Sequence, residues 1–303
     1  MITRDLDEFF AFARNCAPDF GPATAKAAFL VAPDGFARAE QSAQDNRYMA
    51  GVEAFDAARA SAEHRELQRA LSRSLPTICF SGDPDAPDGL FPNNVFATAP
   101  GRLIVGRMRH PVRQREAERD DIRGWFRDVL GYAETDLSRQ PHPCELTGAL
   151  VIDRARGLGF CGLSERCDEE GARRMHEAFG LRATLLFDLA PGEYHSNVVL
   201  AVLAGRAVLV CDDGFADPAV AEAIAELYAP HALRLSPAQR LAFAGNAIAL
   251  SGDAVWMSAA AENALAPADR AILAGAGFAV RAVDLRAIES AGGSLRCCVA
   301  ELF

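Results

Sequence analysis

Along most of the chain, short apolar runs come in pairs separated by a glycine turn, and each pair is followed by a polar loop and an amphipathic helix. The pair at residues 95–108 turns at Gly101, and the pair at residues 148–163 turns at Gly157. Residues 168–180 then place apolar side chains at helical spacing and end on a glycine, which commonly terminates helices. The pattern predicts two strands and a helix as one structural unit.

Two further copies of this unit follow. Residues 198–211 turn near Gly205 and precede a predicted helix at 217–229, which opens on an acidic N-cap followed by proline. Residues 246–257 form the last such pair, and residues 265–277 are the helix predicted after it. The unit therefore repeats to the end of the chain.

A strand predicted at residues 27–33 and a long helix from Glu53 to Ser72 supply a fifth, looser copy. The turns recur at intervals of about 50 residues, a period typical of closed or stacked arrays. We therefore expect one α/β domain over residues 1–303, built as a circular or stacked array. An ordinary α/β sheet with hairpins is the alternative, because it shares many of these local signals.

Composition narrows the function classes. The 303 residues carry a net charge of -10, which argues against binding to nucleic acid or to an anionic membrane surface and favours a small-molecule partner. The first residues lack the apolar run of a signal peptide, and no run of 18 apolar residues is free of charge. We expect a cytoplasmic protein without membrane contact.

Cofactor and metal motifs are missing from the sequence. The eight cysteines show no C-x-x-C spacing, so we expect reduced and mostly buried thiols. The sequence contains no Walker loop and no G-x-G-x-x-G after a strand, and its histidines lack the spacing of metal ligands. We expect an activity that needs no cofactor and no metal.

Two adjacent cysteines, Cys297 and Cys298, lie on the predicted last strand, just after a glycine pair. Side chains alternate along a strand, so one of the two would face the core and the other a cleft. A disulfide between neighbours would be strained. Arg296 beside them would help to hold a thiolate, which is the reactive form of cysteine. The alternative is an inert buried thiol.

Other polar residues also stand at the ends of predicted strands: His195, Asn197, Glu145, Asn93 and Asn94. Taken singly, they have ordinary interpretations as a capping histidine, a solvated acid and turn amides. They belong to different units, however, and equivalent strand ends of a closed ring would converge on one axial pocket. A thiol, an imidazole and a carboxylate together are suited to nucleophilic and acid–base catalysis.

Six motifs occur in order along the chain: FPNNVFAT, RHPVRQREAERDDIRGWF, ELTG, YHSN, GNAIALSGDAVWM and GGSLRC. Together they resemble the pentein superfamily of guanidine-modifying enzymes, which includes arginine deiminases, dimethylarginine dimethylaminohydrolases, amidinotransferases and citrulline-utilisation hydrolases. The resemblance covers most of the chain and is closest to the citrulline-utilisation type.

The resemblance implies a five-bladed α/β propeller of ββαβ-like repeats with pseudo-five-fold symmetry. It places the nucleophile on Cys297, the general acid/base on His195 and its acidic partner on Glu145. A thiolate would attack the carbon of a guanidino or ureido group, and the imidazole would protonate the departing amine and then activate water. Cys297 would then face the pocket and Cys298 the packing side.

Two positions depart from the superfamily pattern. Ala99 and Asn197 stand where the deiminases usually carry acids, the first of them an aspartate that grips the guanidinium. A buried cation without counter-charge is penalised, whereas a neutral ureido group needs donors and acceptors, which Asn93, Asn94 and Asn197 can provide. The pattern favours a citrulline-like or otherwise less cationic substrate.

Three arginines, Arg109, Arg113 and Arg115, are candidates for a clamp on the substrate carboxylate, since arginine binds carboxylates in a bidentate fork. A solvated basic stretch is the alternative. Residues 83–89 are a candidate lid. The leading hypothesis is a cysteine hydrolase that cleaves a C–N bond in an arginine- or citrulline-related compound, and we also expect a homodimer. Amidino transfer to an acceptor amine and an inactive binding protein are the alternatives.

Overall fold

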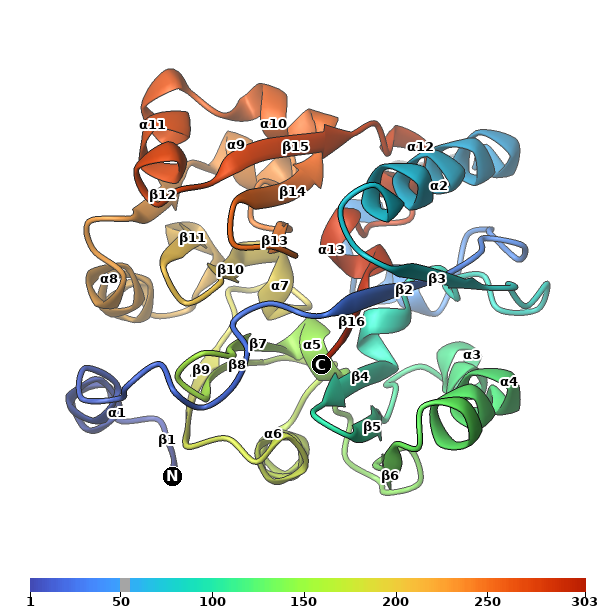
Figure 1. The fold of residues 1–303 in the computed structure, drawn as a ribbon, viewed down its shortest axis with the longest axis horizontal. Coiled ribbons are helices and arrows are strands. Elements are labelled where there is room, and N and C mark those ends of the chain that lie inside the picture. The colour runs from blue at the N-terminus through green and yellow to red at the C-terminus, as the bar shows by residue number, and fades with distance from the viewer. Residues whose placement is uncertain (50–54) are drawn as a thin grey trace.

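The computed structural model describes residues 1–49 and 55–303. Five small sheets surround a common axis, and the longer helices lie at the periphery (Figure 1). In each sheet a first strand pairs antiparallel with a second, which pairs parallel with a third. The strand triplets are β16 (Ala300–Leu302), β2 (Ala27–Val31) and β3 (Thr77–Phe80); β4 (Phe96–Ala99), β5 (Arg102–Val105) and β6 (Ala133–Asp136); β7 (Leu150–Asp153), β8 (Leu158–Leu163) and β9 (Ala183–Asp188); β10 (Leu200–Leu203), β11 (Ala207–Cys211) and β12 (Ala232–Leu235); and β13 (Ile248–Ala249), β14 (Ala254–Ser258) and β15 (Ala279–Val283).

The predicted glycine turns are confirmed at three hairpins. Gly101, Gly157 and Gly205 have φ values of 70°, 71° and 66°, which residues with a side chain rarely adopt. A parallel third strand needs a crossover connection, and in each unit this connection contains an outer helix. The outer helices are α2 (Ala57–Ser72), α4 (Asp120–Gly124) with the π-helical turn η5 (Trp125–Val129), α6 (Glu169–Phe179), α8 (Pro218–Leu227) and α11 (Pro267–Gly275).

The last strand closes the ring. β16 pairs antiparallel with β2, so that Leu302 lies opposite Ala27. Phe29 of β2 also packs against Phe96 and Phe126 of the next unit, with ring centroids 6.5 and 5.4 Å away. The predicted five-bladed propeller is therefore confirmed. The predicted helix start at Glu53 lies outside the described residues.

A short helical turn precedes the first strand in four of the five units. These turns are η3 (Pro92–Asn94), α5 (Leu146–Ala149), α7 (Ser196–Val199) and α13 (Leu295–Cys298). The last of them corrects a prediction, because Cys297 and Cys298 lie in α13 and not on a strand. Both of their amides donate to the carbonyl of Ser294, at 3.0 and 3.3 Å, so the chain turns before β16 begins.

Additional elements decorate the ring. The segment before β2 adds a short strand parallel to β9 and a helix that buries Phe9 and Phe10 against the ring. Among the described residues, no helix combines the length and the apolar character needed to cross a bilayer. The remaining elements are β1 (Ile2–Thr3), α1 (Leu6–Ala13), η1 (Ser42–Gln44), η2 (Arg47–Met49), α3 (Pro111–Gln114), η4 (Arg115–Glu118), η6 (Asp212–Gly214), α9 (Pro237–Leu241), α10 (Ala259–Ala264) and α12 (Arg286–Glu289).

Candidate active site

The helical turns that precede the inner strands meet at one end of the ring axis. Turn η3 contacts both α5 and α13, and α5 also contacts α7. Beside them lies a pocket with about 280 Å³ of empty space, including the part open to solvent. Its lining includes Cys297, Asp88, Asn94, Arg113, Arg166 and Tyr194. Repetition of one unit has therefore brought residues from distant parts of the sequence to a common pocket.

The thiol of Cys297 lies in this lining and is almost fully buried, with 2% of the residue exposed. Asn246 Nδ2 donates to its Sγ at 3.3 Å, and the thiol lies 3.9 Å from Asn197 Oδ1. Oδ1 of Asn246 accepts a hydrogen bond from the backbone N–H of Arg296 at 3.0 Å. Burial raises the pKa of the Cys297 thiol, so the resting group is neutral and needs a nearby positive charge to ionise.

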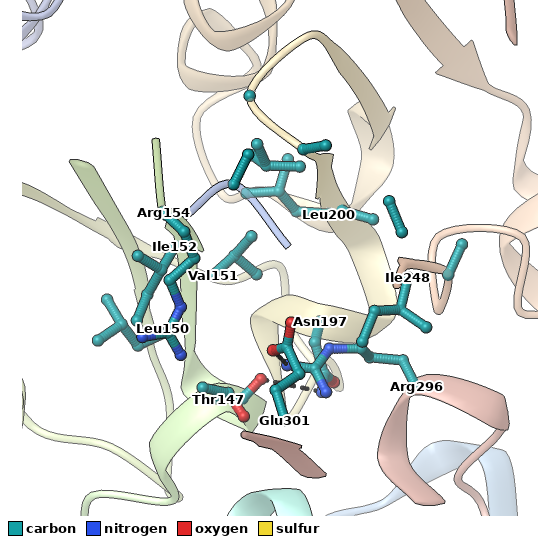
Figure 2. Close-up of a pocket in the computed structure, with 17 residues that line it drawn as sticks. Thr147, Leu150, Val151, Ile152, Arg154, Asn197, Leu200, Ile248, Arg296 and Glu301 are labelled. Atoms are coloured by element: carbon teal, nitrogen blue, oxygen red, sulfur yellow. Dashed lines mark hydrogen bonds and ion pairs between the residues drawn. The ribbon is translucent and has the colours of Figure 1, made fainter. Parts of the chain in front are cut away.

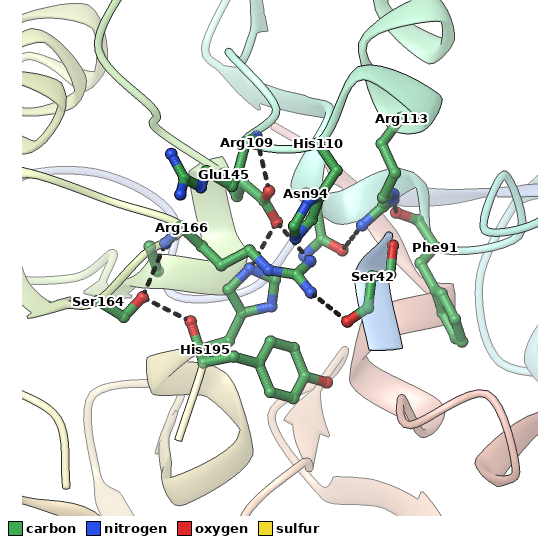
Figure 3. Close-up of polar contacts among 12 residues, drawn as sticks. Ser42, Phe91, Asn94, Arg109, His110, Arg113, Glu145, Ser164, Arg166 and His195 are labelled. Atoms are coloured by element: carbon green, nitrogen blue, oxygen red, sulfur yellow. Dashed lines mark hydrogen bonds and ion pairs between the residues drawn. The ribbon is translucent and has the colours of Figure 1, made fainter. Parts of the chain in front are cut away.

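His195 and Glu145 form a fully buried pair, with Nε2 of the imidazole 2.8 Å from Oε2 of the carboxylate (Figure 3). Burial alone would raise the pKa of Glu145, but Arg166 and His195 hold it well below its usual range. Burial lowers the pKa of His195, against the opposing effect of Glu145. The resting pair is a carboxylate and a neutral imidazole. The second ring nitrogen, Nδ1, is buried and has no partner among the described residues.

A glycine makes this packing possible. A Cβ atom added at Gly148 of the ELTG motif would lie 2.5 Å from Asn94 Nδ2 and 2.8 Å from His195 Cε1. Both distances are far below van der Waals contact, so any side chain would displace the imidazole or the amide. Gly148 therefore fixes the approach of two candidate site residues.

Arg166 is a buried cation that sequence reasoning missed. Its guanidinium donates to Asp45 at 2.5 Å and to Glu145 at 3.4 Å, and Figure 3 shows it between Glu145 and Ser42. It also donates to the carbonyl of Ser42 at 3.1 Å and lies over the Tyr194 ring at 5.2 Å. Each of these guanidinium contacts is with a residue distant in sequence, so the local sequence around Arg166 gives no signal of its role.

The three arginines proposed as a carboxylate clamp do not converge on the pocket. Arg113 lines it, but its guanidinium is engaged with Glu116 at 2.8 Å and with Asn94 Oδ1 at 3.0 Å. Arg109 gives its backbone N–H to the Glu145 carboxylate at 3.0 Å, while its side chain pairs with an exposed acid. Arg115 binds acids at the surface. Three neighbours in sequence point in different directions because they lie on successive short turns.

The amides of the FPNNVFAT motif have separate positions. Asn94 lines the pocket, whereas the buried amide atoms of Asn93 have no partner among the described residues. Ala99 ends β4 in an apolar cluster, next to the hairpin turn and outside the pocket lining. The comparison made for Ala99 was therefore wrong. The motif has a second phenylalanine, Phe91, and the third residue after it is Asn94, which does lie at the site.

Asp88 is another pocket residue that the sequence did not single out, except as part of the candidate lid at residues 83–89. It is 3% exposed, and Ser42 Oγ donates to its Oδ2 at 2.5 Å. Its Oδ1 is buried and has no partner among the described residues. In the sequence it lies between prolines and a glycine, a composition typical of a turn. Within the described ranges, His, Cys, Asp and Glu form no group of three that could hold a metal ion.

Comparison with known proteins identifies relatives of this chain. The family described as eukaryotic N,N dimethylarginine dimethylhydrolase matches residues 32–303. A dimethylarginine dimethylaminohydrolase of Mycobacterium tuberculosis is 28% identical over 216 residues, which cover 71% of this chain and 66% of that relative. The matched segment thus covers slightly less than two thirds of the relative's length.

Solved structures with the same fold include the N-terminal domain of ArgZ, an arginine dihydrolase from cyanobacteria. It has a TM-score of 0.78 and 20% identity, and the match covers 91% of this chain and 97% of that domain. A dimethylarginine dimethylaminohydrolase adduct with 4-chloro-2-hydroxymethylpyridine has a TM-score of 0.69 and 20% identity, covering 91% of this chain and 99% of that one. At 20% identity, both structures show that the fold is shared. The chain belongs to the N,N-dimethylarginine dimethylhydrolase family, within the pentein superfamily that its motifs resemble.

Proposed function

We propose that this chain is a cysteine-dependent hydrolase that cleaves a C–N bond of a guanidino or ureido group in an arginine- or citrulline-related molecule. The observation that carries the proposal is the buried His195–Glu145 pair, 2.8 Å apart, together with Asn197, which follows His195 by two residues and lies 3.9 Å from the Cys297 thiol. The name of the family and that of the mycobacterial relative support the reaction class. Residues 1–303 would act as one catalytic domain.

The resting protonation states define the first step. The Cys297 thiol and the His195 imidazole are both neutral before substrate binds, and Glu145 is a carboxylate. The thiol proton passes to the imidazole, where the Glu145 carboxylate stabilises the imidazolium. The thiolate then attacks the substrate carbon and forms a C–S bond, which gives a tetrahedral adduct.

The second half of the reaction reverses the role of the histidine. Protonated His195 gives its proton to the departing nitrogen, the C–N bond breaks, and a covalent S-alkyl intermediate remains on Cys297. The neutral imidazole then takes a proton from water, whose oxygen attacks the same carbon. The C–S bond breaks, and the proton returns to the sulfur as the thiol reforms.

The amides at the site favour a substrate group with little charge. Asn94 and Asn197 offer both N–H donors and carbonyl acceptors near the sulfur, as a neutral ureido group requires. Asp88 Oδ1, which has no partner within the described parts of the chain, would bind the amino group of an amino-acid substrate. The amides fit citrulline better than a methylated arginine, whereas Asp88 would bind the amino group of either one, and also that of arginine, the substrate class named for ArgZ.

The test is product release from a panel of citrulline, arginine, methylated arginines and agmatine. Purified protein is assayed for ammonia, methylamine and dimethylamine, with Cys297→Ser as the control. Release that depends on Cys297, with the citrulline arm fastest, supports the proposal, whereas activity that survives in Cys297→Ser contradicts it. Products formed only with an added acceptor amine would instead indicate amidino transfer. The homodimer and the cytoplasmic location stay predictions.

A further inference from the structure

A second cavity runs along the inner strands, from the helical turns beside the catalytic pocket toward the hairpin turns (Figure 2). It contains about 540 Å³ of empty space, including the part open to solvent. Strands β7, β10 and β13 form its walls, and Thr147, Asn197 and Arg296 lie among its lining residues. Asn197 also approaches the Cys297 thiol, at 3.9 Å, so a single layer of side chains separates this cavity from the catalytic pocket.

Two arginines face this axial cavity, and they differ in how well they are satisfied. Arg296 donates to Glu301 at 2.9 Å and to the carbonyl of Val299 at 2.7 Å. Arg154 donates through Nη1 to the carbonyl of Thr98 at 3.1 Å, while its Nη2 is buried without a partner among the described residues. Figure 2 shows Arg154 on one side of the cavity and the Arg296–Glu301 pair on the other.

Among residues 1–49 and 55–303, no carboxylate forms an ion pair with Arg154; Glu301, which affects its pKa, is paired with Arg296. Its guanidinium lies 4.2 Å from the ring centroid of Phe303 and 5.1 Å from that of Phe179. Aromatic faces stabilise a cation but accept no strong hydrogen bond. Burial lowers the pKa of Arg154 to about 10; Glu301 opposes this effect, and Arg296 adds to it. With two guanidinium groups and one carboxylate, the lining carries one excess positive charge.

We propose that the axial cavity binds a small oxyanion, either a carboxylate or a phosphate, against the free edge of Arg154. Arginine presents planar N–H donors that match both groups in a bidentate fork, and a desolvated site strengthens such bonds. Arg296 faces the same space and adds a second positive charge. The bound anion would satisfy the buried Nη2 and neutralise the excess charge. This site is separate from the hydrolytic reaction and does not depend on it.

The experiment is calorimetric titration of the full chain with inorganic phosphate and with succinate, at constant ionic strength in chloride. We expect the unchanged chain to bind the anion. In Arg154→Gln the affinity should fall by about tenfold or more, because the bidentate guanidinium fork is lost. Arg206→Gln is the matched control, since Arg206 stands at the hairpin end of the neighbouring blade with its guanidinium 4.4 Å from the Phe278 ring. The control should bind as the unchanged chain does.

Three results would overturn the proposal: no binding of either anion, equal affinity in Arg154→Gln, or equal loss in the Arg206 control. A crystal soaked in selenate locates the anion by its anomalous signal, and a signal confined to Arg113 or Arg166 of the catalytic pocket would also overturn it. Arg154→Lys keeps the charge without the fork, so an intermediate affinity supports the site even if Arg154→Gln folds poorly. A difference between the affinities measured for phosphate and for succinate would show which oxyanion the cavity prefers.

Discussion

The candidate catalytic pocket lies beside the helical turns, whereas the axial cavity runs from these turns along the inner strands toward the hairpin turns, and the two bury arginine in different ways. In the pocket, Arg166 donates to Asp45, Glu145 and a backbone carbonyl. In the cavity, Arg154 has a single acceptor and one buried nitrogen without a partner among the described residues. A satisfied cation fixes its neighbours in place, whereas an unsatisfied one has capacity for a ligand.

The difference also separates two kinds of role. Pocket arginines hold acids such as Glu145 in the ionised state and orient them. The charge of these arginines is therefore neutralised by acids within the protein. Arg154 instead donates to one backbone carbonyl and lies against two aromatic rings, which do not neutralise its charge. Mutations in the pocket and in the cavity should therefore have effects of very different size.

The largest expected effect is at the sulfur. Cys297→Ser should lower kcat by about 10⁴-fold or more, because a hydroxyl is a far weaker nucleophile than a thiolate at this site. Cys298→Ser is the control, since Cys298 is its buried neighbour in the apolar cluster of the ring. Steady-state release of ammonia or amine measures both variants. Comparable losses in the two variants would mean that the sulfur of Cys297 has no special role.

Glu145→Gln should lower kcat by about 10²- to 10⁴-fold, since the imidazolium of His195 loses its carboxylate. It should also cost about 3–5 kcal/mol in the free energy of unfolding, because it leaves the charge of Arg166 buried with one acid fewer. Glu165→Gln, at an exposed acid that pairs with Arg109, is the control. Urea denaturation measures the free energy of unfolding, and initial rates at saturating substrate measure kcat. An unchanged rate in Glu145→Gln would exclude the His195–Glu145 pair from catalysis.

The same variant carries a pH signature. The folded-state pKa of Glu145 is lowered below its ordinary value of 4.5, so its contribution to stability is present above that value and is lost as the pH falls toward the folded-state pKa. The stability difference between the unchanged chain and Glu145→Gln should therefore shrink in acid. Denaturation midpoints between pH 7 and pH 3 test this, and a constant difference would contradict it.

A smaller effect is expected at Asn246, which donates to the Cys297 sulfur at 3.3 Å. Removing this donor in Asn246→Ala should raise the pKa of the thiol further, because the N–H favours the thiolate. We expect alkylation by iodoacetamide to slow about three- to tenfold at fixed pH and its pH profile to move upward. The rate attributable to Cys297 is obtained by subtracting that of the matching Cys297→Ser protein. An unshifted profile would show that the contact does not tune the sulfur.

The smallest expected effect is on the stability of Arg154→Gln in buffer without added oxyanion. Losing an under-paired buried charge should change the free energy of unfolding by only about 1 kcal/mol, in contrast to Arg166→Gln, for which we expect about 3–5 kcal/mol. Thermal or urea unfolding of the two variants compares directly how much each buried arginine contributes to the free energy of unfolding. Equal losses would mean that the two cations are equally well satisfied.

Sequence reasoning proposed candidate site residues whose chemical groups occur in a recognisable local setting. Cys297, His195 and Glu145 were each expected at the start or end of a predicted strand, and their residue types are those of nucleophilic and acid–base catalysis. It missed Arg166, whose partner Asp45 is 121 positions away, and Asp88, whose partner is 46 positions away. Such pairs leave no trace in a local pattern, since only the closed ring brings them together.

The sequence by itself determined the repeat, the hairpin turns and the chemical groups available, because apolar periodicity, glycine turns and side-chain chemistry are local properties. Tertiary structure alone decided that Cys297 and Cys298 share a helical turn, that Ala99 lies away from the pocket, and that Arg113 is engaged with Glu116. Those outcomes depend on the competition among partners that meet only after the ring closes. The same closure left Arg154 in the lining of the axial cavity, with one nitrogen that has no partner in the part of the chain that the structure describes.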